Sequence, residues 1–110
     1  MARLIDWINK MSNNEPIEAV IIGEMGWSNF NEPPGLPGDY KDKIGIPMSF
    51  EEAIPYITYE FDSGYGAPGC TAMVAYTTSW IVSVVQYDGS TAPIKIPRNP
   101  KGYIPDMPGG

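Results

Sequence analysis

Two short stretches of this chain carry residue types that could bind a ligand. In the first, the glycine-rich loop of residues 64–69, Gly64 and Gly66 flank Tyr65. Glycines let backbone N–H groups approach an anion closely, and consecutive ones can form a nest around phosphate. An aromatic side chain on such a loop can stack on a nucleobase. The loop is therefore a candidate nucleotide site, although its spacing is not that of a P-loop. The alternative is a tight connector into the next strand.

The second stretch is the Pro97-Arg98-Asn99-Pro100 segment. Arginine offers a planar fork that fits phosphate or carboxylate, and asparagine can hydrogen-bond to a base edge. The prolines restrict the backbone on either side, which lowers the entropy lost when a ligand is bound. Trp80, at the start of a β-prone run, is a second aromatic side chain that can stack on a base. The alternative is that Arg98 is a surface residue in a proline-rich strap.

The composition argues against catalysis. The chain contains no histidine, which removes the usual general base, the commonest metal ligand and every histidine-dependent nucleophile system. The single cysteine, Cys70, is expected as a small buried residue at the start of a strand. Glu51, Glu52, Glu60 and Asp62 could form an acid–base pair or a cation site, but Glu51 and Glu52 diverge on an expected helix. We expect a protein that is not an enzyme and that uses neither a cofactor nor a metal.

The segment that must position both stretches is rich in strands. Residues 71–76 and 80–87 are rich in β-branched and aromatic residues, and the short polar break between them predicts an antiparallel hairpin. Both faces of the 80–87 run are largely apolar, which predicts a central strand covered on both sides. An Asp-Gly turn then leads to a third strand at residues 92–96. Pro93 lacks an N–H and confines that strand to a sheet edge.

The first half of the chain predicts two short helices and one more strand. Residues 2–12 have the apolar spacing of an amphipathic helix, and residues 17–22 form an almost wholly apolar run, typical of an interior strand. Ser49 and Glu52 have the spacing of a capping box, so a second helix begins just after Ser49. Pro55 follows its first turn and makes this helix short or kinked.

Long irregular segments connect these elements. Prolines and glycines in residues 24–47 argue against regular structure, while Trp27, Phe30 and Tyr40 argue against disorder, so we expect an ordered wrap. Residues 97–110 are expected to form an extended strap. Residues 1–110 are therefore expected to form a single domain of the α+β class. It would contain an antiparallel sheet of about four strands, two short helices and long Pro/Gly-rich loops.

Charge is unevenly distributed along the chain, whose net charge is −6. Residues 15–62 carry ten acids and two lysines, a net of −8, whereas residues 89–110 carry a net of +2. The overall sign argues against non-specific binding to nucleic acid, and the lack of a long apolar run or a signal peptide argues against a membrane span or export. We expect a cytoplasmic protein with a small basic region, although the charges can also be read simply as a solvated surface.

Three motifs carry a resemblance to known sequences: Tyr-x-Phe-Asp-x-Gly-Tyr-Gly-Ala-Pro-x-Cys, Gln-Tyr-Asp-Gly and Pro-Arg-Asn-Pro. Together they span residues 59–99, and this combination resembles small uncharacterised proteins encoded by phages and prophages. Phage proteins of this size and acidity without catalytic residues are often inhibitors of host defence. One such group, the sponge proteins that include anti-CBASS sponges, sequesters cyclic nucleotide signals as homo-oligomers. The resemblance therefore implies, by analogy of class, an antagonist of host defence.

These observations favour a non-catalytic binding protein with a small, cyclic or linear, nucleotide as its ligand. We expect the ligand to be held by Gly64, Tyr65, Gly66, Trp80, Arg98 and Asn99. We also expect a homo-oligomer, because so small a domain cannot cover its apolar faces alone. The alternative is an acidic inhibitor that uses residues 15–62 to block a basic surface on a host enzyme.

Overall fold

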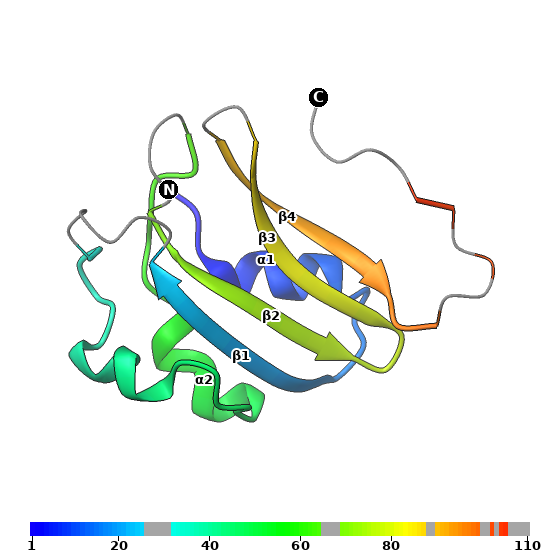
Figure 1. The fold of residues 1–110 in the computed structure, drawn as a ribbon, viewed down its shortest axis with the longest axis horizontal. Coiled ribbons are helices and arrows are strands. Elements are labelled where there is room, and N and C mark those ends of the chain that lie inside the picture. Colours follow the sequence, from blue (N-terminus) through cyan, green and yellow to red (C-terminus); the bar gives the residue numbers. More distant parts are fainter. Residues whose placement is uncertain (26–31, 65–68, 88–89, 100–101, 103, 106–110) are drawn as a thin grey trace.

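A computed structural model of the protein describes residues 1–25, 32–64, 69–87, 90–99, 102 and 104–105. The elements, in chain order, are α1 (Leu4–Met11), β1 (Ile17–Met25), the 3₁₀ helix η1 (Gly38–Lys43), α2 (Phe50–Ile57), β2 (Thr71–Thr77), β3 (Trp80–Tyr87) and β4 (Ser90–Pro97). The strands form one antiparallel sheet in the order β1-β2-β3-β4 (Figure 1). The predicted α+β class, with about four antiparallel strands and short helices, is confirmed.

The ends of both α-helices follow from local sequence. At the start of α2, the Ser49 N–H donates to Glu52 Oε1 at 3.0 Å and the Glu52 N–H donates to Ser49 Oγ at 3.1 Å, which confirms the predicted capping box. α1 ends before Asn13 and Asn14, whose φ angles of 54° and 66° are tolerated by asparagine. Both helices have only eight residues and turn a narrow apolar stripe towards the sheet.

The segment expected to lack regular structure is partly regular. β1 continues beyond residue 22 to Met25, and η1 forms within the proline- and glycine-containing stretch. A proline is acceptable directly before a helix, and Pro37 occupies this position at η1. Tyr40 is buried in the core, as expected for an aromatic residue of an ordered wrap. The other two aromatic residues of that stretch lie outside the described residues, as does the Asp-Gly turn at residues 88–89.

One face of the sheet carries the hydrophobic core. α1 and α2 lie on this face, where α1 contacts β4 and α2 contacts β1. The side chains buried between the helices and the strands include Leu4, Ile8, Val20, Ile22, Ala53, Ile57, Met73, Ala75 and Val82. Phe61 joins the same core, where Trp7 contacts its ring edge-on at a centroid distance of 5.3 Å.

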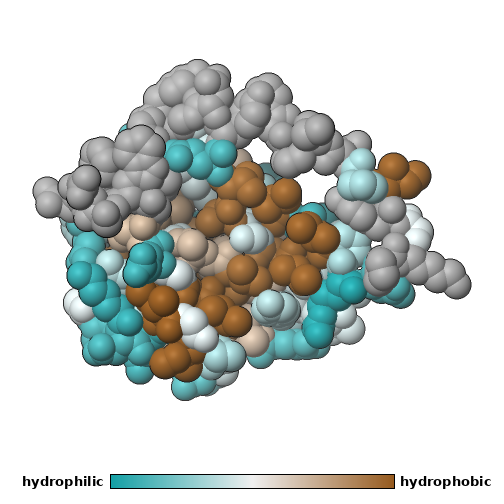
Figure 2. Space-filling view, in the orientation of Figure 1, coloured by the Kyte–Doolittle hydropathy of each residue, from teal (hydrophilic) through white to brown (hydrophobic). Residues whose placement is uncertain are grey.

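The opposite side of the sheet is also apolar, and none of the described helices covers it. We call this side the open face; its larger residues are Ile21, Val74, Tyr76, Ile81, Ile94 and Ile96. Strand register places them together, because directly paired residues share a face. Figure 2 shows apolar residues gathered over the sheet in this view. β3 is central, as predicted, but the expectation that it is covered on both sides is wrong for the described residues. The physical reason is that both short helices pack into one core.

Candidate functional site

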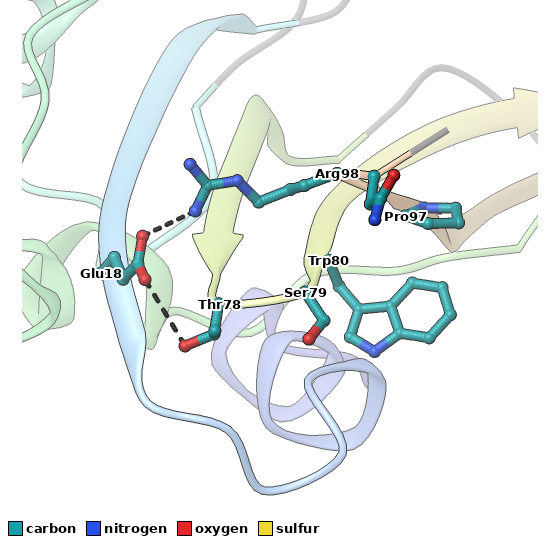
Figure 3. Close-up of a pocket in the computed structure, with 7 residues that line it drawn as sticks. Glu18, Thr78, Ser79, Trp80, Pro97 and Arg98 are labelled. Carbon is teal, nitrogen blue, oxygen red and sulfur yellow. Dashed lines mark hydrogen bonds and ion pairs between the residues drawn. The ribbon is translucent and has the colours of Figure 1, made fainter. Parts of the chain in front are cut away.

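A shallow pocket of about 720 Å³ lies at the end of the sheet where β2 turns into β3. Its lining comes from β1, from the β2–β3 turn and from the end of β4, and consists of Glu18, Thr78, Ser79, Trp80, Pro97, Arg98 and Asn99 (Figure 3). Antiparallel pairing brings these segments together, since the start of β3 is opposite the end of β4 and the start of β1 is opposite the end of β2. The pocket therefore gathers polar side chains from distant parts of the sequence.

The β2–β3 turn that forms the floor of the pocket is fixed by a buried hydroxyl and a carboxylate. Thr77 Oγ1 donates to Glu15 Oε1 at 2.7 Å and accepts the N–H of Trp80 at 2.9 Å. The same Glu15 oxygen accepts the N–H of Ser79 at 3.0 Å. These hydrogen bonds from Thr77 and Ser79 favour the ionised carboxylate and lower the pKa of Glu15. Glu15 therefore holds the turn in place.

Arg98 is held by three parts of the chain at once. Its Nη1 donates to Glu18 Oε1 at 2.6 Å and to the Thr77 carbonyl at 2.8 Å, and its backbone N–H donates to the Ser79 carbonyl at 2.9 Å. Its guanidinium carbon also lies 5.8 Å from the centre of the Tyr76 ring. The predicted planar fork therefore binds a carboxylate of the same chain (Figure 3).

Glu18 reaches Arg98 because of an irregularity in β1. The register of β1 against β2 shifts between Ile17 and Ala19, so Glu18 is an extra residue in a β-bulge. Bulges redirect a side chain that would otherwise follow the alternation of the strand. The Thr78 hydroxyl makes a long contact of 3.5 Å with the second oxygen of Glu18. Sequence reasoning missed both Glu18 and Glu15, and no local pattern marks them, because their partners are 60 or more positions away.

Trp80 brings an aromatic surface and a second cation to the pocket. The Lys95 ammonium lies 4.1 Å from the centre of the indole ring, a cation–π contact between neighbouring strands. Two cations, Lys95 and Arg98, therefore lie near two carboxylates, Glu15 and Glu18. The pocket is a mixed polar site with an aromatic wall and is not a strongly basic one.

The structure brings together three of the six predicted site residues. Trp80, Arg98 and Asn99 all line the pocket. Gly64 lies at the other end of the sheet, because the neighbouring Ser63 carbonyl accepts the Thr91 N–H at 2.9 Å and Thr91 pairs with Gln86. Gln86 is six residues along β3 from Trp80, a separation of about 20 Å.

The two remaining predicted residues, Tyr65 and Gly66, lie outside the described residues. The Gly64 N–H donates to Asp62 Oδ1 at 2.8 Å, a bond within its own turn. The described part of the glycine-rich loop therefore does not contribute to the pocket.

Two groups with potential chemical reactivity are buried away from the pocket. Cys70 is only 2% exposed and directly precedes β2, which confirms the prediction of a buried residue where a strand starts, and burial raises the pKa of its thiol to about 12. Burial likewise raises the pKa of Tyr59 to about 12, and its hydroxyl accepts the N–H of Thr71 at 2.9 Å. Both groups are protonated near neutral pH and take part in the core.

Two further findings apply only to the part of the chain that the structure describes. No cluster of three or more Cys, Asp or Glu side chains is placed to hold a metal ion there. None of the helices in that part is long and apolar enough to cross a membrane.

The chain matches no protein-family model, and neither curated proteins nor solved structures show significant similarity to it.

Proposed function

We propose that this protein is a non-catalytic binding protein that holds a small nucleotide in the pocket at the β2–β3 turn. The observation that carries the proposal is that Trp80, Arg98 and Asn99 line one pocket. Their side chains are the kinds that stack on a base or bind a phosphate or a base edge. Its volume of about 720 Å³ lies within the range of small-molecule sites, about 300–1,000 Å³.

The chemistry of the lining suits a nucleotide with separate aromatic and anionic parts. The indole of Trp80 offers a stacking surface for a base, a contact worth about 1–3 kcal/mol. Asn99 offers an amide that can hydrogen-bond to a base edge, and Glu18 offers an acceptor for an amino or ribose hydroxyl group. Both side-chain hydrogen bonds of Arg98 described above use Nη1, and a guanidinium has two further donor nitrogens for a phosphate.

In the cell, we infer that this binding would serve a phage-encoded antagonist that sequesters a cyclic nucleotide signal of host defence in the host cytoplasm. The resemblance of residues 59–99 to phage-encoded proteins supports this biological role, and the pocket supports the ligand class. A sponge needs binding without turnover, which agrees with a chain that contains no histidine.

Calorimetric titration with a panel of cyclic and linear nucleotides tests the proposal. Arg98→Lys keeps the charge but loses the planar fork, and we expect it to weaken binding about tenfold, since a charge-assisted contact contributes about 1.5–3 kcal/mol. Asn99→Ala removes the amide and should weaken binding roughly two- to tenfold, since a neutral hydrogen bond contributes about 0.5–1.5 kcal/mol. Asn9→Ala, an exposed asparagine on α1, is the matched control and should bind normally. Failure of every nucleotide to bind the wild type, or binding by both pocket variants as tight as that of the wild type, would refute this site.

A second function, acidic inhibition of a host protein, is favoured by the exposed carboxylates of residues 15–62. Glu24, Asp42, Glu51, Glu60 and Asp62 are all exposed. Such a surface would steer association with a basic partner, and salt would weaken it. Replacing Glu51, Glu60 and Asp62 by lysine should then abolish protection of a phage in an infection assay. Unchanged protection by this triple variant would instead favour the nucleotide proposal, because the pocket is untouched.

A further inference from the structure

The open face of the sheet is an apolar feature of the described surface that the proposed pocket does not use. Its residues come from all four strands: Ala19, Ile21 and Gly23 on β1 continue into Val74 on β2, Ile81 on β3 and Ile94 on β4. These residues are uncharged, and the charged pair of Glu18 and Arg98 lies at one end of the face, where the guanidinium is over the Tyr76 ring. Ile96 is 45% exposed, and the others in its neighbourhood are half-buried. A contiguous apolar patch of this kind usually marks an interaction surface (Figure 2).

The open face can lose its water at little cost. Ser83 is the hydroxyl residue at its centre, and this hydroxyl already donates to the Met73 carbonyl at 2.8 Å. Burying Ser83 therefore leaves its donor satisfied. The side chains are small where β1 meets β2, because Gly23 lies beside Ala72, and an added Cβ at Gly23 would be only 3.0 Å from the Ala72 Cβ. An apolar surface whose central hydroxyl is satisfied is suited to contact with another sheet.

We infer that the open face binds a second copy of this chain, so that two sheets pack face to face. Two-fold symmetry requires a surface that complements itself. The open face does so without bringing unpaired like charges together, because its strand residues are apolar and the charges at its end, Glu18 and Arg98, neutralise each other. This condition is demanding for a chain of net charge −6, since most other surfaces would place carboxylates opposite carboxylates. A basic partner protein would be attracted to the acidic surface of residues 15–62 rather than to the open face.

The edges of the sheet disfavour the other common way in which strands associate. Val20 of β1 exchanges two backbone hydrogen bonds with Met48, at 2.8 and 2.9 Å, so part of this edge is already paired. At the opposite edge, Pro93 of β4 has no N–H to donate. Strand addition at an edge needs a continuous row of free donors and acceptors. The face is therefore a better surface for self-association than either edge.

The area of the open face indicates a dimer of moderate affinity. Four strands about 4.8 Å apart, each contributing five or six residues at about 3.3 Å, give a footprint of roughly 350 Å². Two such faces, with the relief of their side chains, bury on the order of 1,000 Å² in total, which is about the smallest area of a biological interface and typical of a weak one. Aligned packing of twisted sheets at a separation of about 10 Å is the geometry expected. We expect dissociation in the micromolar range.

The dimer does not depend on nucleotide binding, although one contact connects the two. Tyr76 of the open face lies under Arg98, whose guanidinium lines the pocket. Assembly would therefore place the pocket at the rim of the interface. A chain that dimerises without binding a nucleotide would refute the proposed function and keep this inference. A chain that binds a nucleotide but stays monomeric would refute this inference and keep the proposed function.

Sedimentation equilibrium from about 1 to 100 µM tests the inference. The wild type should approach twice the 12.1 kDa mass of one chain. Ile96→Glu places a charge on the open face of both copies and should weaken the dimer about tenfold or more. Ile46→Glu is the matched control, because Ile46 is 50% exposed outside the sheet, and it should dimerise like the wild type. Val74→Glu is a second variant on the face, and circular dichroism checks that each variant is folded.

Three results would overturn the inference. A wild type that remains a 12.1 kDa monomer at the highest concentration would show that the face does not bind a second copy. Dimers unaffected by Ile96→Glu and Val74→Glu would place the interface elsewhere. A monomeric wild type that dimerises only after deletion of residues 100–110 would assign the face to that segment of its own chain.

Discussion

Neighbouring residues of the same type have different surroundings on the two faces of the sheet. Ile22 on the helix side is 1% exposed, whereas Ile21, on the open face, is only half-buried. β2 repeats the pattern with Met73 buried and Val74 half-buried. Both faces are apolar, yet only one is covered by the described helices. Apolar composition thus identifies two surfaces that avoid water, and the described helices, which are short, cover just one of them.

The largest expected difference between the faces is in stability. Ile22→Ala should lower the free energy of unfolding by about 2–5 kcal/mol, because it leaves a cavity in a packed core. Ile21→Ala, one position away on the open face, should cost about 1 kcal/mol or less, because its surroundings are partly solvent. Denaturant titration of both variants at a concentration well below dimerisation measures this difference. Equal losses would contradict the distinction between a packed and an open face.

The local elements of the fold could be predicted from the sequence because their causes are local. β-Branched runs separated by a short polar break gave β2 and β3 within a residue or two, and Ser49 with Glu52 gave the start of α2. Whether helices cover one face of the sheet or both could not be predicted, since the sequence of β3 is apolar at alternate positions on both faces in either case. Which face the helices choose depends on tertiary packing and not on spacing along the chain.

The candidate site was predicted in part, for a related reason. Trp80, Arg98 and Asn99 meet because an antiparallel pair returns the chain to the same end of the sheet. Gly64 is expected beside them because its N–H could bind a phosphate, but β2 carries the chain along the length of the sheet before Trp80 is reached. The link between Glu18 and Arg98 spans 80 positions and depends on a bulge, so no local pattern could reveal it.

A smaller effect concerns two threonines on the covered side of the sheet. Thr77 and Thr91 are both buried, with 0% and 6% exposure. The Thr77 hydroxyl is bonded to Glu15 and Trp80, whereas the Thr91 hydroxyl has no hydrogen-bond partner in the described part of the molecule. Thr77→Val should therefore cost about 1–3 kcal/mol, because it leaves polar partners unpaired. Thr91→Val should be neutral or slightly stabilising.

Thermal denaturation of the two threonine variants compares them directly, since each replaces a hydroxyl by a methyl group of similar size. A comparable loss of stability in both variants would mean that Thr91 also makes a hydrogen bond of structural value. A loss of stability in Thr77→Val alone would show that the Thr77 hydroxyl stabilises the β2–β3 turn, whereas the Thr91 hydroxyl is buried without contributing to stability.

The smallest expected effect is at the carboxylate of Glu15, which holds the β2–β3 turn at one end of the sheet. Hydrogen bonds from Thr77 and Ser79 lower the pKa of Glu15 in the folded protein. Its contribution to stability is therefore complete above the ordinary glutamate pKa of about 4.3 and is lost as the pH falls through the lower folded-state value. Glu15→Gln keeps an acceptor oxygen but removes the charge. It should lower the melting temperature near neutral pH, and the difference from the wild type should shrink in acid.

Melting curves at about pH 7 and about pH 3 measure this change, because the contribution of the ionised carboxylate is complete at the first pH and is reduced below the ordinary glutamate pKa of about 4.3. Glu51→Gln, an exposed glutamate in the first turn of α2, is the matched control for removal of one negative charge. The control should not reproduce the pH-dependent difference, since Glu51 is remote from the turn. If Glu15→Gln keeps the same difference at both pH values, the hydrogen bonds at Glu15 act through their geometry alone and its ionisation contributes nothing to holding this end of the sheet.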